Sequence, residues 1–137
     1  MTNPFWNKTL TIYTRSYDAN TKTTKWYKYT VDNCFYGVNQ NSALKDLNII
    51  KANTYIARIP FHSCYLPYDQ WLVSSDKVNH LSITKGSIIV NGVIPDVISD
   101  NNSGNTLLNK YADKCFKASI YKENDTFLLK HYYAGSD

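Results

Sequence analysis

One stretch, Ile83 to Asp96, limits most strongly what this chain can fold into. It contains a β-branched run from Ser87 to Val90 that lies between glycine-containing turns, which is typical of a buried strand. Asn91-Gly92 follows this run, and both residues tolerate the positive φ that a type I′ hairpin turn needs. We therefore expect residues 83–94 to supply two central strands, the second ended by Pro95, which cannot donate a ladder hydrogen bond.

A long hairpin is also expected near the N-terminus. Residues Thr9 to Tyr17 alternate in polarity, so that Leu10 and Ile12 share one face of a strand. A polar, turn-forming segment joins this strand to an aromatic and β-branched run from Lys25 to Val31. The two runs predict an antiparallel hairpin over residues 9–31.

Further segments extend the β pattern towards the C-terminus. Residues 54–60 combine aromatic and β-branched residues and are expected to form another central strand. Residues 116–133 predict a C-terminal hairpin around a polar turn at Lys122 to Asp125. The polar stretch Asn39 to Asn53 is expected to be a loop, with an irregular helical turn near Ala43 to Leu47.

Two short helices are expected among the strands. Pro67 favours a helix over Tyr68 to Val73, whose Trp71 and Leu72 are placed to plug one open end of the sheet. A second helix, capped by Asn105 or Thr106, is expected after a polar loop at residues 97–105.

The composition is that of one globular domain. The chain is 43% hydrophobic and 19% charged, and no segment approaches the ~18 consecutive apolar residues of a membrane span. Met1 to Lys8 lacks the apolar core of a signal peptide, so we expect the protein to be made and used in a cytoplasm. The expected fold is one mostly β domain over residues 1–137, a small antiparallel β-barrel or sandwich with long hairpins and one or two short helices.

The charge pattern bears on nucleic-acid binding. The formal net charge is +4 with 15 basic residues, of which Arg15 and Arg58 are the arginines. The lysines are spread along the chain and form no basic stripe, which argues against specific binding of nucleic acid.

Residues with metal-binding or catalytic chemistry are few. Cys34, Cys64 and Cys115 are odd in number and far apart, which favours buried free thiols over a zinc site or a disulfide framework. His62 and Cys64 suggest a base and a nucleophile, with His80 as another base, but no nearby residue supplies the third group that orients such a pair.

Metal binding by His62, His80 and His131 is not expected either, because they lack ligand spacing. We therefore predict no enzyme, no cofactor and no metal site.

Aromatic and basic residues interleave on the N-terminal hairpin. The pattern allows a stacking platform for a single-stranded nucleic acid, but no recognised single-strand motif accompanies it. Cross-strand aromatic pairs, or contact with another subunit, are the favoured interpretation. The candidate subunit-contact residues are Tyr13, Arg15, Tyr17, Trp26, Tyr27 and Tyr29.

The order of elements from Thr9 to Gly135 resembles a family of small proteins from tailed phages and prophages of Gram-positive bacteria. The pieces that carry this resemblance are Arg58-Ile59-Pro60, Lys85-Gly86 with Gly92, and Lys130-His131 before Gly135. Members of this family are described as head-tail connector or minor capsid proteins. They are similar in size and strand order to the small β-barrels that build the neck ring by ring and close the portal channel.

The resemblance implies a head completion or stopper-like protein of the virion neck, assembled in the bacterial host cytoplasm. Its implied partners are copies of itself in a ring and the neighbouring portal, adaptor and tail proteins, with no membrane. Non-specific contact with DNA in the channel stays open. The alternatives are a tail terminator, a tail-tube-like or capsid decoration protein, and, less favoured, a monomeric module that binds a peptide or nucleic acid.

Overall fold

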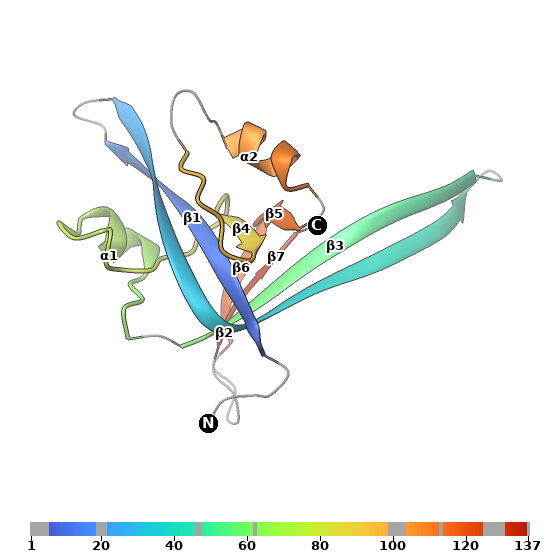
Figure 1. The fold of residues 1–137 in the computed structure, drawn as a ribbon, viewed down its shortest axis with the longest axis horizontal. Helices are drawn as coiled ribbons and strands as arrows, with labels where there is room; N and C mark the ends of the chain where they lie inside the picture. The colour runs from blue at the N-terminus through green and yellow to red at the C-terminus, as the bar shows by residue number, and fades with distance from the viewer. Residues whose placement is uncertain are drawn as a thin grey trace.

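The computed structural model describes residues 6–18, 22–45, 48–61, 63–98, 104–112, 114–124 and 131–136. These residues form a mostly β domain with two short helices (Figure 1). The elements are β1 (Lys8–Asp18), β2 (Thr23–Lys45), β3 (Asn48–Pro60), α1 (Tyr68–Leu72), β4 (Ile88–Asn91), α2 (Gly104–Lys110), β5 (Cys115–Lys117), β6 (Ile120–Asn124) and β7 (His131–Gly135).

The described strands form one antiparallel sheet in the order β5-β4-β1-β2-β3-β7-β6. Its two edge strands, β5 and β6, are separated in sequence by Ala118 and Ser119 alone. The Ala118 N–H donates to Ser87 O at 2.8 Å and the Ser119 N–H donates to Gly135 O at 2.9 Å. Strands β5 and β6 thus follow one another end to end and do not pair with each other, so the sheet is not closed into a barrel. The predicted fold class, a mostly β domain, is confirmed.

Strand β2 changes partner at a β-bulge. Its first part pairs with β1 up to Leu10↔Val31 and, after a register shift, at Lys8↔Cys34, and its second part pairs with β3 from Phe35↔Arg58 onwards. Asn33 lies within the shifted stretch and has a left-handed backbone with φ 60°. A bulge of this kind bends the strand and redirects its pairing.

Beyond the bulge, β2 and β3 form a two-stranded arm that extends away from the body (Figure 1). Their pairing continues to Lys45↔Asn48, whereas β7 pairs with β3 over Ile56 to Pro60. The loop and helical turn predicted for residues 39–53 are therefore wrong over residues 39–45 and 48–53, and residues 46–47 lie outside the described residues. Apart from Ile49 and Ile50, most of these residues have weak intrinsic strand preference, so their strand conformation depends on cross-strand pairing.

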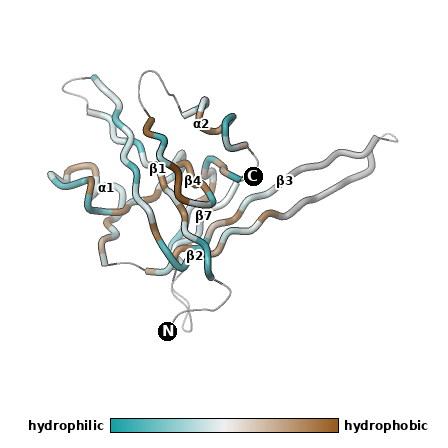
Figure 2. Tube along the Cα trace, viewed as in Figure 1, coloured by the Kyte–Doolittle hydropathy of each residue, from teal (hydrophilic) through white to brown (hydrophobic). Residues whose placement is uncertain are grey.

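The main hydrophobic core lies on one face of the sheet. Leu10 and Ile12 of β1 are buried there, as their alternation predicted, together with Ala57 and Ile59 of β3. Burying one such leucine or isoleucine stabilises the fold by roughly 2 kcal/mol. In Figure 2 the hydrophobic positions concentrate in the body around β4.

A second hydrophobic cluster lies on the opposite face of β1 and β4 and includes a residue of α2. Its buried residues are Tyr13, Ile88, Val90, Ile94, Ile98, Leu107 and Cys115. Leu107 is the buried residue of α2, so this cluster holds the helix to the sheet.

The predicted central hairpin is wrong in its second strand. Residues 88–91 form β4, but β4 already pairs with β1 on one side and β5 on the other. No edge of β4 is left for Val93 and Ile94, and the Gly92 N–H instead donates to Thr9 O at 2.9 Å.

The predicted C-terminal hairpin is confirmed in part. Strands β6 and β7 pair as far as Asn124↔His131, while residues 125–130 lie outside the described part of the chain. The run predicted from Phe116 to Tyr121 divides at Ala118-Ser119 into β5 and β6, which pair with different strands. Both predicted helices are present, and α1 ends one residue before the expected Val73. Helix α2 begins at Gly104, so the predicted cap is wrong, because Asn105 and Thr106 lie inside the helix.

Candidate functional site

The six predicted contact residues lie on two faces of the β1–β2 hairpin. The register pairs Arg15 with Trp26 and Thr14 with Tyr27. Since neighbouring residues of a strand point to opposite faces, Tyr13, Arg15, Tyr17 and Trp26 lie on one face, and Tyr27 and Tyr29 on the other. They do not form one continuous contact surface.

Tyr13 belongs to the core of the domain, because it is 1% exposed. Its hydroxyl donates to Asp96 O at 2.6 Å, and burial, followed by the charge of Asp96, raises its pKa well above the ordinary value of 10.0. Its assignment as a contact residue is therefore corrected. Tyr17 is 57% exposed and Arg15 is also exposed, so both stay predicted contact residues. Trp26 packs against the second hydrophobic cluster and Tyr29 against the first.

Helix α1 packs on this hairpin through aromatic rings. The buried Trp71 ring meets Tyr27 edge to face at 5.5 Å and stacks on Tyr68 at 5.9 Å, whereas Leu72, the other residue of the predicted plug, is half-buried. The Tyr68 hydroxyl also donates to Arg15 O at 2.8 Å. These contacts fix the segment around α1 against the outer half of β1 and β2.

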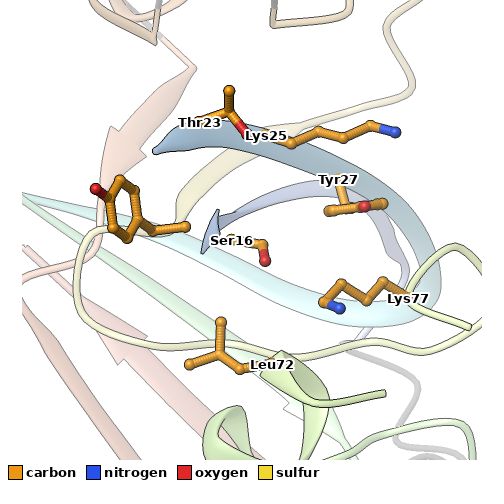
Figure 3. Close-up of a pocket in the computed structure, with 7 residues that line it drawn as sticks. Ser16, Thr23, Lys25, Tyr27, Leu72 and Lys77 are labelled. Atoms are coloured by element: carbon orange, nitrogen blue, oxygen red, sulfur yellow. The ribbon is translucent and has the colours of Figure 1, made fainter. Parts of the chain in front are cut away.

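A polar hollow of about 350 Å³ lies between the hairpin and the α1 segment (Figure 3). Figure 3 shows Ser16, Thr23, Lys25 and Tyr27 from the hairpin around the cavity, with Leu72 and Lys77 on the side of α1. The described lining residues are Ser16, Tyr17, Thr23, Lys25, Tyr27, Leu72 and Lys77. These described residues supply two ammonium groups, four hydroxyl groups and no carboxylate.

A second hollow, of about 110 Å³, lies on the other face of the same two strands. Its lining residues are Arg15, Trp26, Tyr68, Thr84, Lys85, Gly86 and Lys117. These described residues supply three cationic side chains and again no carboxylate. Gly86, with φ 97°, allows the tight turn that brings Lys85 to this hollow.

The histidines and cysteines singled out in the sequence do not meet in one site within the described residues. His80 Nδ1 is 2.7 Å from Asp76 O, and His131 Nε2 is 2.8 Å from Arg58 Nη1. Tyr29 forms a side-chain hydrogen bond with Cys64, and His62 lies outside the described residues. Among the residues that the structure describes, no group of three His, Cys, Asp or Glu side chains could hold a metal ion.

Tyrosines form a buried cluster that the sequence did not indicate. The Tyr65 and Tyr121 hydroxyls are hydrogen-bonded to each other, and the Tyr65 ring stacks on Tyr132 at 3.9 Å. Burial, followed by Tyr65 and Glu123, raises the pKa of Tyr132 to about 12. These hydroxyls are therefore neutral over the ordinary pH range, and the cluster holds β6 and β7 to the segment before α1.

Comparison with known proteins identifies a family. A family model described as "Family of unknown function (DUF6751)" matches residues 5–137. Neither the curated proteins nor the solved structures contain a match. Within the described part of the chain, no helix is both long enough and apolar enough to span a membrane.

Proposed function

The chain belongs to the DUF6751 family of unknown function, and we propose that it is a structural subunit that assembles with copies of itself. The proposed place of this assembly is the head-tail neck of a tailed phage, where the subunits would form a ring between the portal side and the tail. The observation that carries self-assembly is the two-stranded arm, and the phage setting comes from the sequence resemblance.

The arm is long and, among the described strands, has no third strand beside its outer part. Seven residue pairs run from Asn39↔Thr54 to Lys45↔Asn48. At about 3.3 Å per residue they extend roughly 20 Å, which is enough to reach over a neighbouring subunit. An isolated two-stranded hairpin is marginally stable in water, and its edges present unpaired backbone groups. Both properties favour an arm that is stabilised by contact with a partner.

Apolar residue types occupy the pairs near the end of this arm. Leu44 pairs with Ile49 and Ala43 pairs with Ile50. In the proposed assembly, a neighbouring subunit would cover these apolar residue types. In a ring, every subunit both gives and receives the same contact, so one modest interface is repeated around the closed assembly.

The test compares the full-length chain with a variant whose arm is shortened. Residues 40–53 are replaced by Asn-Gly, which joins the paired positions Asn39 and Thr54 through a type I′ turn. We expect the full-length chain to oligomerise in native mass spectrometry, and the shortened variant to remain folded by circular dichroism and monomeric. Val93→Ser, at an exposed position after β4 and outside the arm, is the matched control and should assemble normally.

Two results would contradict the proposal. A full-length chain that stays monomeric at high concentration, with or without portal and tail proteins, would rule out self-assembly. A shortened variant that assembles like the full chain would rule out the arm. In purified particles, a copy number matching the portal supports the neck, whereas a shell-like or tube-like excess points to a decoration or tail-tube protein.

A further inference from the structure

The fold gathers cationic side chains that are scattered in the sequence. Arg15 and Lys25 come from the β1–β2 hairpin, Lys77 follows α1, Lys85 precedes β4 and Lys117 ends β5. These five of the 15 basic residues line two hollows on opposite faces of one strand pair. The even distribution of lysines along the sequence therefore did not predict that several of them line the same hollows.

No described carboxylate neutralises the larger hollow. Lys77 Nζ donates to Ser74 O at 2.8 Å, and Lys25 Nζ lies 5.2 Å from the Tyr27 ring centre. Both ammonium groups keep donor capacity for a ligand, because each has three N–H groups. The ion pair found among the described residues joins Lys110 to Asp96, which do not line either hollow.

The acidic residues of the neighbouring α1 segment are directed elsewhere. Asp69 Oδ1 accepts a hydrogen bond from the Gln70 N–H at 3.0 Å. The Asp76 carboxylate accepts from Asn79 Nδ2 at 3.1 and 3.2 Å. Neither Asp69 nor Asp76 is among the described residues that line a hollow.

The groups around the larger hollow are those that contact phosphate. Lysine ammonium and Ser, Thr and Tyr hydroxyl groups are the usual protein donors to phosphate oxygens of nucleic acids. The aromatic rings are less suited to stacking on bases, since Tyr27 is covered by Lys25 and by the edge of Trp71. The chemistry favours recognition of the backbone without reading of base sequence.

We propose that the larger hollow, on one face of the β1–β2 hairpin, binds the phosphate backbone of a nucleic acid, with Lys25 and Lys77 contacting the phosphates. This inference is independent of the proposed self-assembly, because it rests on the β1–β2 hairpin and the segment around α1 and not on the arm.

The test uses fluorescence anisotropy of the full-length chain with labelled duplex DNA over a series of salt concentrations. The variant Lys25→Gln with Lys77→Gln should bind about tenfold more weakly at low salt and lower the slope of log K against log salt by roughly 2. The matched control, Lys8→Gln with Lys122→Gln, removes the same charge from exposed positions outside both hollows and should bind like the wild type.

Three outcomes would overturn the inference. The first is no binding to DNA at low salt, and the second is an equal loss in the hollow variant and the control, which would reflect net charge alone. The third is tighter binding of poly-glutamate than of DNA with the same dependence on Lys25 and Lys77, which would identify an acidic protein segment as the partner. The arm-shortened variant should still bind DNA, with the affinity of one subunit. A failure of the self-assembly proposal can therefore be told apart from a failure of the nucleic-acid proposal.

Discussion

At the residue scale, Asn33 occupies a left-handed backbone conformation between the two halves of β2. That conformation is easy for Asn and Gly, but costs other residues roughly 1–2 kcal/mol because Cβ meets a backbone carbonyl. Asn33→Ala should therefore lower the free energy of unfolding by about 1 kcal/mol, as measured by urea denaturation. Asn33→Gly, which keeps the conformation accessible, is the control and should change it far less. An equal loss in both variants would show that the Asn33 side chain, and not its backbone, matters.

At the element scale, α2 has seven residues and is too short to be stable alone. Beside the packing of Leu107, it is held by Asp96, whose carboxylate accepts from Lys110 Nζ at 2.9 Å and from the Tyr111 hydroxyl at 2.6 Å. The hydrogen bond from Lys110, followed by that from Tyr111, lowers the pKa of Asp96 below its ordinary 3.8.

A carboxyl group with a lowered pKa adds stability above its unfolded pKa and loses it as pH falls through the folded pKa. The free energy of unfolding should therefore fall as the pH drops from near 4 into the acid range, and Asp96→Asn should flatten that part of the curve. Urea denaturation at a series of pH values measures both effects. Asp69→Asn, exposed on α1, serves as the control. Parallel curves for Asp96→Asn and the wild type would contradict the role of Asp96.

At the scale of the whole molecule, the two hydrophobic clusters each enclose a thiol. Cys34 lies in the first cluster and Cys115 in the second. Burial, followed by the charge of Asp32, raises the pKa of Cys34 to about 12, so its reactive thiolate is rare at neutral pH. Both thiols should react with iodoacetamide only as fast as the whole domain unfolds, while the half-buried Cys64 should react sooner. Mass spectrometry of labelled peptides over a urea series would show this order, and native-state labelling of Cys34 as fast as Cys64 would contradict it.

The two cationic hollows show the limit of sequence reasoning about the candidate site. Arg15 and Tyr17 could be named from the alternation of one strand, because that pattern acts over neighbouring residues. Lys77, Lys85 and Lys117 could not, because they lie in three separate segments that only the sheet order brings together. The positions of the hollows therefore could not be predicted from patterns of neighbouring residues in the sequence.

The sequence by itself determined the β class, the hairpin over residues 9–31, the burial of Leu10 and Ile12, and the helix after Pro67. These features follow from side-chain alternation and backbone preference within a few residues. The tertiary structure alone decided that residues 39–45 and 48–53 form an arm and that β4 pairs with β1 and β5. Strand pairing joins residues far apart in the chain, so a polar segment becomes a strand, or an apolar one loses its expected partner, according to which edges are free.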